Sequence, residues 1–406
     1  MSKMKLILAS GVAPAIISGA YANTLTGLIP SLYAGLDVVS RELVGYIPSV
    51  TRNATAERAA VGQTTTYPIA PPVAGRDITP TMVMTNPPDY AIDNGNITIT
   101  KSREFPFGFN GEEQRGLNAN GAGFSVVQAD LFAQALRGIV NEMELDIATA
   151  AAAAASRAYG TAGTAPFASG VGDAAQIRKI LDDNGAPLTG RSLIVNTTSG
   201  AALRTNTQLT KALEAGTTMT LRDGELLNLH GMSIKETGQS ISKTKGTGAI
   251  ATTTNAGFAV GATTIALASA GTGTITPGDV ITFAGDTNKY VVVTGDADVS
   301  GGGSIVIAAP GLRRAIPAAT TAITVGDSYS VGGVAFSSDA IVLAARAPAL
   351  PQEGDLAIDR MMLTDPRSGM VFEVSVYPGR RMVEYSVAAA WGWKVVKPAH
   401  TALLLG

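Results

Sequence analysis

The segment 125–158 carries the strongest periodic pattern in the sequence, and it limits what the chain can fold into. Its apolar residues recur at helical spacings of four, three, four and four, namely Phe132, Leu136, Ile139, Met143 and Ile147. The pattern Ser125–Gln128 resembles a capping box, alanines fill 150–155, and Gly160 is expected to end the helix. Such a helix of about 34 residues spans roughly 50 Å. Because it carries one apolar stripe, we expect it to lie as a strut across a sheet.

Membrane insertion is not expected for any part of the sequence. Four charged residues lie within the predicted helix: Arg137, Glu142, Glu144 and Asp146. No other stretch of 18 uncharged apolar residues occurs. The N-terminus resembles a secretory signal, with Lys3 and Lys5 before an apolar run and small residues near 20–22. Gly11 and Pro14 interrupt this run, so the sequence disfavours a cleaved signal peptide.

The rest of the chain changes character several times. The pattern suggests an N-terminal arm at 1–55 with short helical pieces around 22–45. An extended hairpin is predicted at 56–104, where prolines at 68, 71, 72 and 80 cannot donate to a ladder and therefore favour an edge or protruding position. The segment 105–165 contains the long helix.

The second half of the chain combines α/β and all-β patterns. A helix at 173–184 that ends at Gly185, a strand Ser192–Asn196 and a further helix over 199–217 predict an α/β region at 166–240. Turn signals every 8–12 residues in 241–332 predict a small β-barrel or sandwich, with strands near 263–268, 279–285, 289–295, 304–309 and 328–336. The α/β pattern returns at 333–406, with strands in 340–348, 370–378 and 380–398. The β unit is therefore predicted to be an insertion.

Composition narrows the function without fixing it. The chain has 406 residues, so two or three domains are expected. Charged residues make up 15% of the chain, against about 25% in typical soluble domains. A subunit that covers much of its surface with neighbours would look like this, and so would a β-rich secreted protein. The net charge of −2, without any Lys/Arg run, allows only diffuse and sequence-blind contact with DNA.

Catalytic motifs are not found in the sequence. The absence of cysteine excludes disulfides, thiolate metal sites and cysteine nucleophiles. His230 and His400 are the only histidines, and neither has metal-ligand spacing. In the segment 238–245, Ser242 replaces the glycine that a phosphate-binding loop requires before its lysine.

Paired carboxylates and tryptophans also have simpler explanations than catalysis. Glu112–Glu113 is expected in a Gly/Asn-rich loop and Asp182–Asp183 in the last turn of a helix, both solvated. Trp391 and Trp393 alternate on one predicted strand beside three alanines, which indicates packing. We therefore predict no enzyme, with no catalytic, cofactor-binding or metal-ligating residues and no cofactor.

Three stretches of the sequence resemble one protein family, and they occur along the chain in the same order as in that family. They are 107–163 with its Asn141–Asp146 block, the turn and strand at 272–285, and the closing strand and tail at 381–406. They resemble the major capsid proteins of tailed bacteriophages with the Hong Kong 97-type fold, in the phage P-twenty-two branch that carries an inserted β-barrel.

The resemblance implies an α+β fold whose parts follow the segments above. They are an N-terminal arm (1–55), an extended hairpin or E-loop (56–104), a P-domain with a spine helix (105–165), the first part of an A-domain (166–240), an inserted all-β barrel (241–332) and closing strands of the A- and P-domains with a tail (333–406). The region that corresponds to the family's long inter-capsomer loop, roughly Thr252–Gly261, is short, so a bridge through that loop is not implied. The isopeptide bond of the Hong Kong 97 prototype is not implied either.

The resemblance also implies a function. The chain would be a structural protein that assembles as hexamers and pentamers into an icosahedral head in the host bacterial cytoplasm, and it would be found in the virion. Its partners would be scaffolding, portal and decoration proteins, with non-specific contact to packaged DNA and no membrane. Two alternatives stay open: a secreted or cell-surface β-rich structural or adhesive protein lacking about the first 22 residues, and a hydrolase with an unrecognised site.

Overall fold

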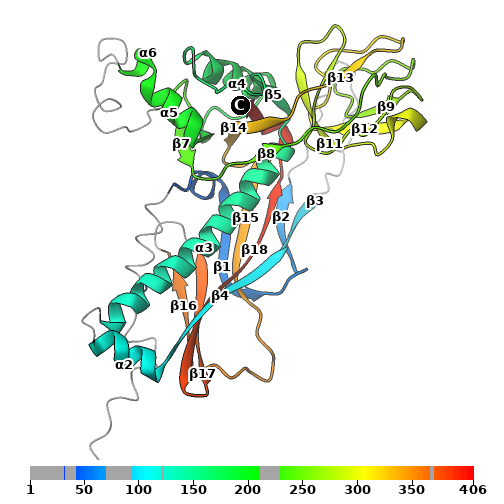
Figure 1. Ribbon diagram of the computed structural model, residues 1–406. Helices are drawn as coiled ribbons and strands as arrows, with labels where there is room; N and C mark the ends of the chain where they lie inside the picture. The colour runs from blue at the N-terminus through cyan, green and yellow to red at the C-terminus, as the bar shows by residue number, and fades with distance from the viewer. Residues whose placement is uncertain (1–31, 33–42, 70–92, 120–122, 211–227, 366–369) are drawn as a thin grey trace, which may run out of the picture.

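A computed structural model of the chain describes residues 32, 43–69, 93–119, 123–210, 228–365 and 370–406 (Figure 1). The architecture mixes helices and strands, as predicted. One long helix crosses a six-stranded sheet and reaches an eleven-stranded sheet at its other end. The described helices and 3₁₀ turns are η3 (Ile47–Ser49), α2 (Gly111–Ala119), α3 (Phe124–Ala153), α4 (Gly172–Asp183), α5 (Thr197–Thr205), α6 (Thr207–Thr210), η4 (Val299–Gly301) and η5 (Pro398–His400).

The six-stranded sheet is organised around one long strand, β18. Its strands are β1 (Thr51–Ala59), β4 (Lys101–Asn110), β15 (Ile341–Pro348), β16 (Asp359–Thr364), β17 (Val371–Gly379) and β18 (Met382–Val395). Along one edge β18 pairs with β4, and along the other it pairs first with β17 and then with β15. β1 adds to β15 in parallel. The sheet therefore joins segments from both ends of the chain.

The eleven-stranded sheet has the C-terminal strand near its middle. Its strands are β5 (Arg157–Tyr159), β6 (Arg191–Asn196), β7 (Ser233–Thr237), β8 (Ser242–Lys243), β9 (Thr264–Leu267), β10 (Val280–Phe283), β11 (Lys289–Thr294), β12 (Gly303–Ile307), β13 (Ile323–Val325), β14 (Tyr329–Ser337) and β19 (Thr401–Leu405). β19 lies between β5 and β14. Alternate residues of β6 and β14 face opposite cores, so α4 and α5 cover one face of this region and α3 the other.

The apolar stripe of α3 is confirmed. Its five predicted residues are fully buried, and the helix packs on β4 and β18. The predicted ends are wrong: the helix begins at Phe124 after Gly123, whose φ is 75° and which has no side chain to act as a cap. The backbone N–H of Phe124 donates instead to Oδ1 of Asn118 at 3.0 Å. It ends at Ala153, because the chain leaves the helix to form β5, so Gly160 does not end it.

The capping box lies one helix earlier than expected. The backbone N–H of Glu113 donates to Oδ1 of Asn110 at 2.7 Å, and the backbone N–H of Asn110 donates to Oε2 of Glu113 at 2.9 Å. This reciprocal pair begins α2, so Glu112–Glu113 lies in a helix and not in a loop. The sequence signal was the spacing Asn-x-x-Glu.

The other predicted helices of the α/β region form with small differences. α4 matches its prediction, and Gly185 follows its end with a φ of 71°. The helix predicted over 199–217 is interrupted at Asn206, which separates α5 from α6. The remainder of that prediction, 211–217, lies outside the described residues.

The β-rich unit has its own hydrophobic core, and the first and last strands of its ladder are linked by backbone hydrogen bonds. Consecutive ladders join β13, β10, β11, β12 and β9. The segment 251–254 bridges the two ends of this series through backbone hydrogen bonds. Toward β13, the N–H of Thr253 donates to Thr321 and that of Ile323 donates to Ala251. Toward β9, the N–H of Thr254 donates to Ala266 and that of Ala268 donates to Thr252. Fourteen buried hydrophobic residues, from Ala251 to Ile323, fill the interior.

The β-rich unit is narrower and less separate than predicted. The strand expected at 328–336 is β14, which pairs with β6 and β19 and thus belongs to the α/β sheet. β8 pairs with β14 as well. In addition, β11 pairs with β5, so the unit continues the larger sheet. Its own strands therefore lie between about 246 and 327.

The extended hairpin is present but shorter than the predicted 56–104. β2 (Thr64–Ile69) and β3 (Asp93–Thr98) form a separate two-stranded sheet. β1 and β4, which flank it, belong to the six-stranded sheet. Residues 70–92, with three of the four prolines, lie outside the described residues, as does most of the predicted arm.

We expect Leu136→Ala to lower the free energy of unfolding by about 2–5 kcal/mol, because it leaves a cavity beneath a fully buried position. Val126→Ala, on the same helix but 57% exposed, should change it by less than about 0.5 kcal/mol. Urea denaturation of the two variants measures both values. Equal losses in both would contradict the assignment of the buried face.

Candidate functional site

The two histidines are held in structural positions. His230 is exposed, adopts a φ of 49°, and accepts a hydrogen bond on its carbonyl oxygen from Arg178 at 2.6 Å. His400 is half-buried, and burial lowers its pKa below the ordinary value. The histidines lie on different segments, and neither belongs to a metal cluster: among the residues that the structure describes, no three His, Asp or Glu side chains could hold a metal ion.

Ser337, Asp339 and His400 lie together but are not arranged for nucleophilic catalysis. Nδ1 of His400 is 3.5 Å from Oγ of Ser337, which instead donates to Asp339. Asp339 also accepts from Nζ of Lys397 at 2.6 Å. Ser337 is 1% exposed, so its hydroxyl cannot reach a substrate. A triad would require the carboxylate to orient the imidazole.

Both carboxylates of the Asp182–Asp183 pair make ion pairs. Burial raises the pKa of Asp182, but hydrogen bonds and charge from Arg191 and Arg178 outweigh this and hold it below the ordinary value. Asp183 pairs with Arg157 at 3.1 Å. These interactions link α4 to neighbouring strands and do not form a cleft pair.

The remaining sequence candidates are also structural. Lys243, in the phosphate-loop-like segment, donates to Oγ1 of Thr276 at 2.9 Å. Trp391 is fully buried and donates from Nε1 to Asp146 of α3 at 3.0 Å. Within the described ranges, no helix has the length and apolar character that a bilayer crossing requires.

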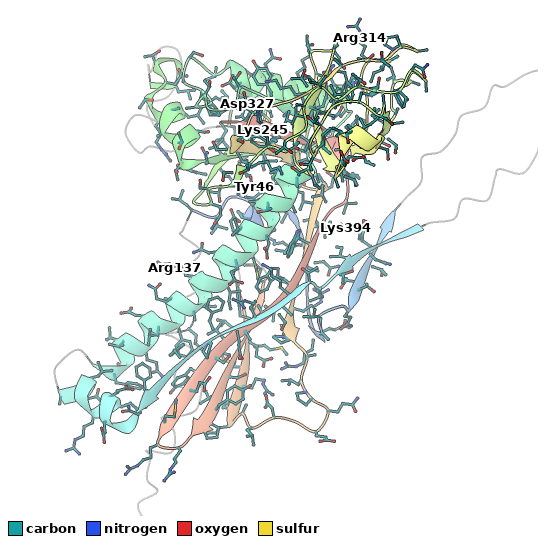
Figure 2. The ribbon with its side chains drawn as sticks, turned by 45° about the vertical axis from the view of Figure 1, so that its right-hand side comes forward. Tyr46, Arg137, Lys245, Arg314, Asp327 and Lys394 are labelled. Carbon is teal, nitrogen blue, oxygen red and sulfur yellow. The ribbon has the colours of Figure 1, made fainter. Side chains whose placement is uncertain are left out.

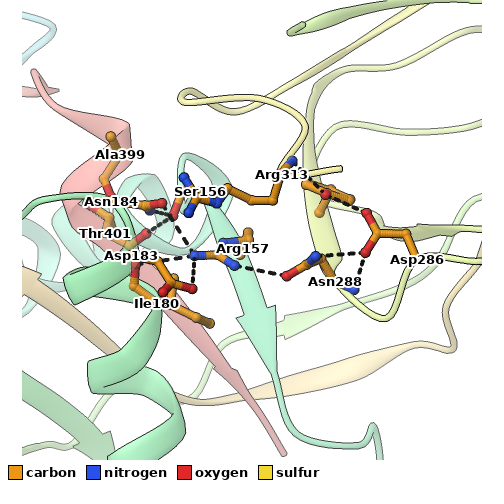
Figure 3. Close-up of polar contacts among 11 residues, drawn as sticks. Ser156, Arg157, Ile180, Asp183, Asn184, Asp286, Asn288, Arg313, Ala399 and Thr401 are labelled. Atoms are coloured by element: carbon orange, nitrogen blue, oxygen red, sulfur yellow. Dashed lines mark hydrogen bonds and ion pairs between the residues drawn. The ribbon is translucent and has the colours of Figure 1, made fainter. Parts of the chain in front are cut away.

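The junction between the β-rich unit and the α/β region is centred on Arg157 (Figure 3). Arg157 is 4% exposed. Its guanidinium donates to Oδ1 of Asn288 at 2.9 Å, and on the other side to Asp183, Asn184 and the carbonyl of Ile180. The latter three lie at the C-terminal end of α4, where a cation is favoured. One buried side chain thus ties the unit to the rest of the molecule.

Asn184 and Tyr290 extend the junction on its two sides. Asn184 donates to Oγ of Ser156 at 3.0 Å and to the carbonyl of Ala399 at 2.7 Å. The hydroxyl of Tyr290 donates to Asp286 at 2.7 Å and accepts from the backbone N–H of Arg313 at 3.0 Å. Burial raises the pKa of Tyr290 to about 12, so it stays a donor at neutral pH.

Sequence analysis missed Arg157, because this residue falls in the last turn of the helix predicted over 125–158. The available signal was the end of the alanine run at Ala155, followed by the strand-forming residue Tyr159.

The base of the β2–β3 hairpin is the other notable surface feature. Ile97 and Ile99 are fully buried and pack with Ala59, Ala344 and Ala390. Nζ of Lys394 donates to the carbonyl of Asn96 at 3.1 Å. Beyond this base the two strands project from the side of the molecule (Figure 2).

Comparisons with known proteins give a likeness in fold only. No protein-family model and no curated protein matches the sequence. Solved structures that resemble it include a protein of Mycobacterium phage Che8 (16% identity, 85% of each chain covered, TM-score 0.41), the capsid of the cyanophage P-SCSP1u (14%, 88% of this chain and 86% of that chain, 0.44) and the mature capsid of bacteriophage PhiM1 (11%, 88% and 85%, 0.43). These values are too low to transfer a function or the role of any residue.

We expect Arg157→Leu to lower the free energy of unfolding by about 1–3 kcal/mol, because it removes hydrogen bonds on both sides of the junction. Amide exchange should accelerate in β10 and β11 more than in β6. As a control, Lys245→Met removes an exposed pair with Asp327 and should leave both readouts unchanged. Uniform acceleration across the two sheets would argue against a local junction.

Proposed function

We propose that the chain is the major capsid protein of a tailed double-stranded DNA bacteriophage, and that identical copies assemble into its icosahedral head. The β2–β3 hairpin carries the proposal. Over its described residues, it is a two-stranded sheet that projects from the body and packs against it at its base. An isolated two-stranded hairpin is at best marginally stable in water. A partner surface therefore supplies the missing contacts.

A second copy of the chain is the partner that suits this hairpin. Charged residues make up only 15% of the chain, which favours a subunit that covers much of its surface in an assembly. The resemblance of segments 107–163, 272–285 and 381–406 to the Hong Kong 97-type capsid proteins supports the same partner. In this proposal the hairpin is the E-loop and α3 is the spine helix.

The β-rich unit between about 246 and 327 corresponds in this proposal to the inserted barrel. Its ladder returns to its start through the segment 251–254, and its interior is filled with hydrophobic side chains. It would stabilise the subunit and decorate the outer surface of the head. The α/β region on both sides of it would be the A-domain, and the six-stranded sheet with α3 the P-domain.

Assembly would rest on many moderate contacts. Each hairpin lies over an adjacent subunit and each N-terminal arm packs beneath one, in hexamers and pentamers. A contact of standard size buries about 1,600 Å², and much of its gross gain is offset by ordering. A closed shell engages many contacts at once, so it persists although single contacts are reversible. Scaffolding, portal and decoration proteins would assist in the host cytoplasm, and packaged DNA would be contacted non-specifically.

Electron microscopy tests the proposal directly. We expect the full chain, expressed alone or with the scaffolding protein of its phage, to form closed particles. Intact-mass measurement in the same preparation addresses the secreted alternative, which requires loss of about 22 N-terminal residues. A monomer in both preparations would overturn the proposal.

Shortening the hairpin should abolish shells while leaving the subunit folded. Replacing residues 68–94 by Asn-Gly joins Tyr67 to Gly95, which are paired across the strands, through a two-residue turn. We expect native circular dichroism and an unchanged unfolding midpoint, but no closed particles. Normal particles from this variant would show that the hairpin does not hold neighbours.

Deleting the β-rich unit should instead impair the subunit itself. Residues 246–327 can be removed where Lys245 and Ser328 are already in contact, at 3.1 Å. The deletion bares one edge of β5 and the buried positions that Val280 and Val291 cover. We expect aggregated or mis-assembled protein by sedimentation and microscopy. Closed particles of normal size would refute the stabilising role.

A further inference from the structure

Glu144 of α3 is a fully buried carboxylate that holds a segment near the N-terminus. Its Oε1 accepts from the backbone N–H groups of Gly45 at 2.6 Å and Tyr46 at 2.8 Å, and its Oε2 from that of Ile47 at 3.0 Å. The hydroxyl of Thr237 donates to Oε1 at 3.0 Å. Three consecutive backbone groups therefore meet one carboxylate at the start of η3.

The partners of this carboxylate are neutral donors. Three charged or titratable groups face the site from the surrounding elements: Tyr46 on the segment itself, Lys235 on β7, and Arg52 on β1, which acts on Lys235. Nζ of Lys235 is committed to Oγ of Ser49 at 2.9 Å, and Ser49 in turn donates to the carbonyl of Gly45 at 2.7 Å. The cation thus braces the segment and does not pair directly with Glu144.

The segment is also the cover of the carboxylate. Tyr46 and Ile47 are 1% and 2% exposed, and the ring of Tyr46 stacks on Phe336 with centroids 6.0 Å apart. Figure 2 shows Tyr46 close to the C-terminal part of α3. If the segment leaves, water reaches Glu144. A burial without a cation partner is costly for an ionised carboxylate and much less costly for a neutral one.

We propose that Glu144 is a proton-sensitive catch for residues 43–50, which holds the segment more firmly when protonated and loosens as the pH rises. This inference goes beyond the proposed function and does not depend on it. The catch joins α3 and β7 to residues 43–50, which belong to the predicted N-terminal arm (1–55).

Burial and hydrogen bonding act on the pKa of Glu144 in opposite directions, and burial is the larger effect. Burial raises the pKa of Glu144 above its ordinary value, although the hydrogen bonds from Tyr46, Ile47, Gly45 and Thr237 act in the opposite direction. When the segment opens, the carboxylate is hydrated and its pKa returns toward the ordinary value. The closed form therefore binds a proton more tightly than the open form. By linkage, protonation adds stability to the closed form at low pH, and this added stability is lost as the pH increases through the raised pKa.

Hydrogen exchange of the full chain tests the catch without any substitution. Mass spectrometry of a peptide that covers residues 43–50, corrected for intrinsic exchange rates, reports the opening of the segment between pH 5 and pH 8. We expect at least threefold greater protection at pH 5, with a β19 peptide as an unchanged reference. Protection that is constant, or that falls on acidification, would overturn the proposal.

Two variants and one control identify the group. Glu144→Gln mimics the neutral acid, so its protection should not depend on pH. Thr237→Val removes one donor to the carboxylate and should move the transition to higher pH. Glu142→Gln, on the same helix but paired with Arg103 at the surface, should behave as the unsubstituted chain does. If Glu144→Gln fails to fold, the Thr237→Val shift decides, and its absence would refute the assignment.

Discussion

The packing of α3 against two sheets is the interaction on which the rest of the structure depends. At its N-terminal end the helix buries large side chains: the ring of Phe132 meets that of Phe107 edge to face, with centroids 4.8 Å apart. At its C-terminal end the buried residues are alanines such as Ala148 and Ala151. Small side chains allow a helix to approach a sheet more closely than large side chains do.

Local sequence patterns were sufficient to predict the elements that bury one side and expose the other. The stripe that includes Leu136 and Ile139 gave the buried face of α3 because a helix with one apolar side must turn that side inward. The turn signals around Gly285 predicted the β10–β11 hairpin, because the two strands follow each other closely in the sequence. Composition was informative for the candidate site, because two histidines and no cysteine leave few residues for catalytic chemistry. In the structure, the contacts of His400 have a structural explanation.

Long-range pairing is where sequence reasoning failed. β18 bonds three other strands, and nothing local distinguishes this from an ordinary edge. The pairing of β11 with β5 joins the β-rich unit to the α/β sheet, although the two are more than a hundred residues apart. Sequence analysis used Glu144 only as a charge that argues against a membrane span, and it did not predict the burial of this side chain. The usable signal was its position between Val140 and Ala148, one turn away on each side, which are both buried.

Buried polar contacts give this framework its orientation. Apolar packing alone tolerates small shifts, whereas a buried polar group that loses its partner is costly. Asp146 fixes the six-stranded sheet on α3 through Trp391, Glu144 fixes the N-terminal segment, and Arg157 fixes the β-rich unit. Each of these three residues lies on α3 or just beyond its end. One helix therefore positions the six-stranded sheet, the N-terminal segment and the β-rich unit. In the proposed shell these parts would meet different neighbours. Rigid coupling along α3 would then make a contact at one edge of the subunit sensitive to contacts at the others.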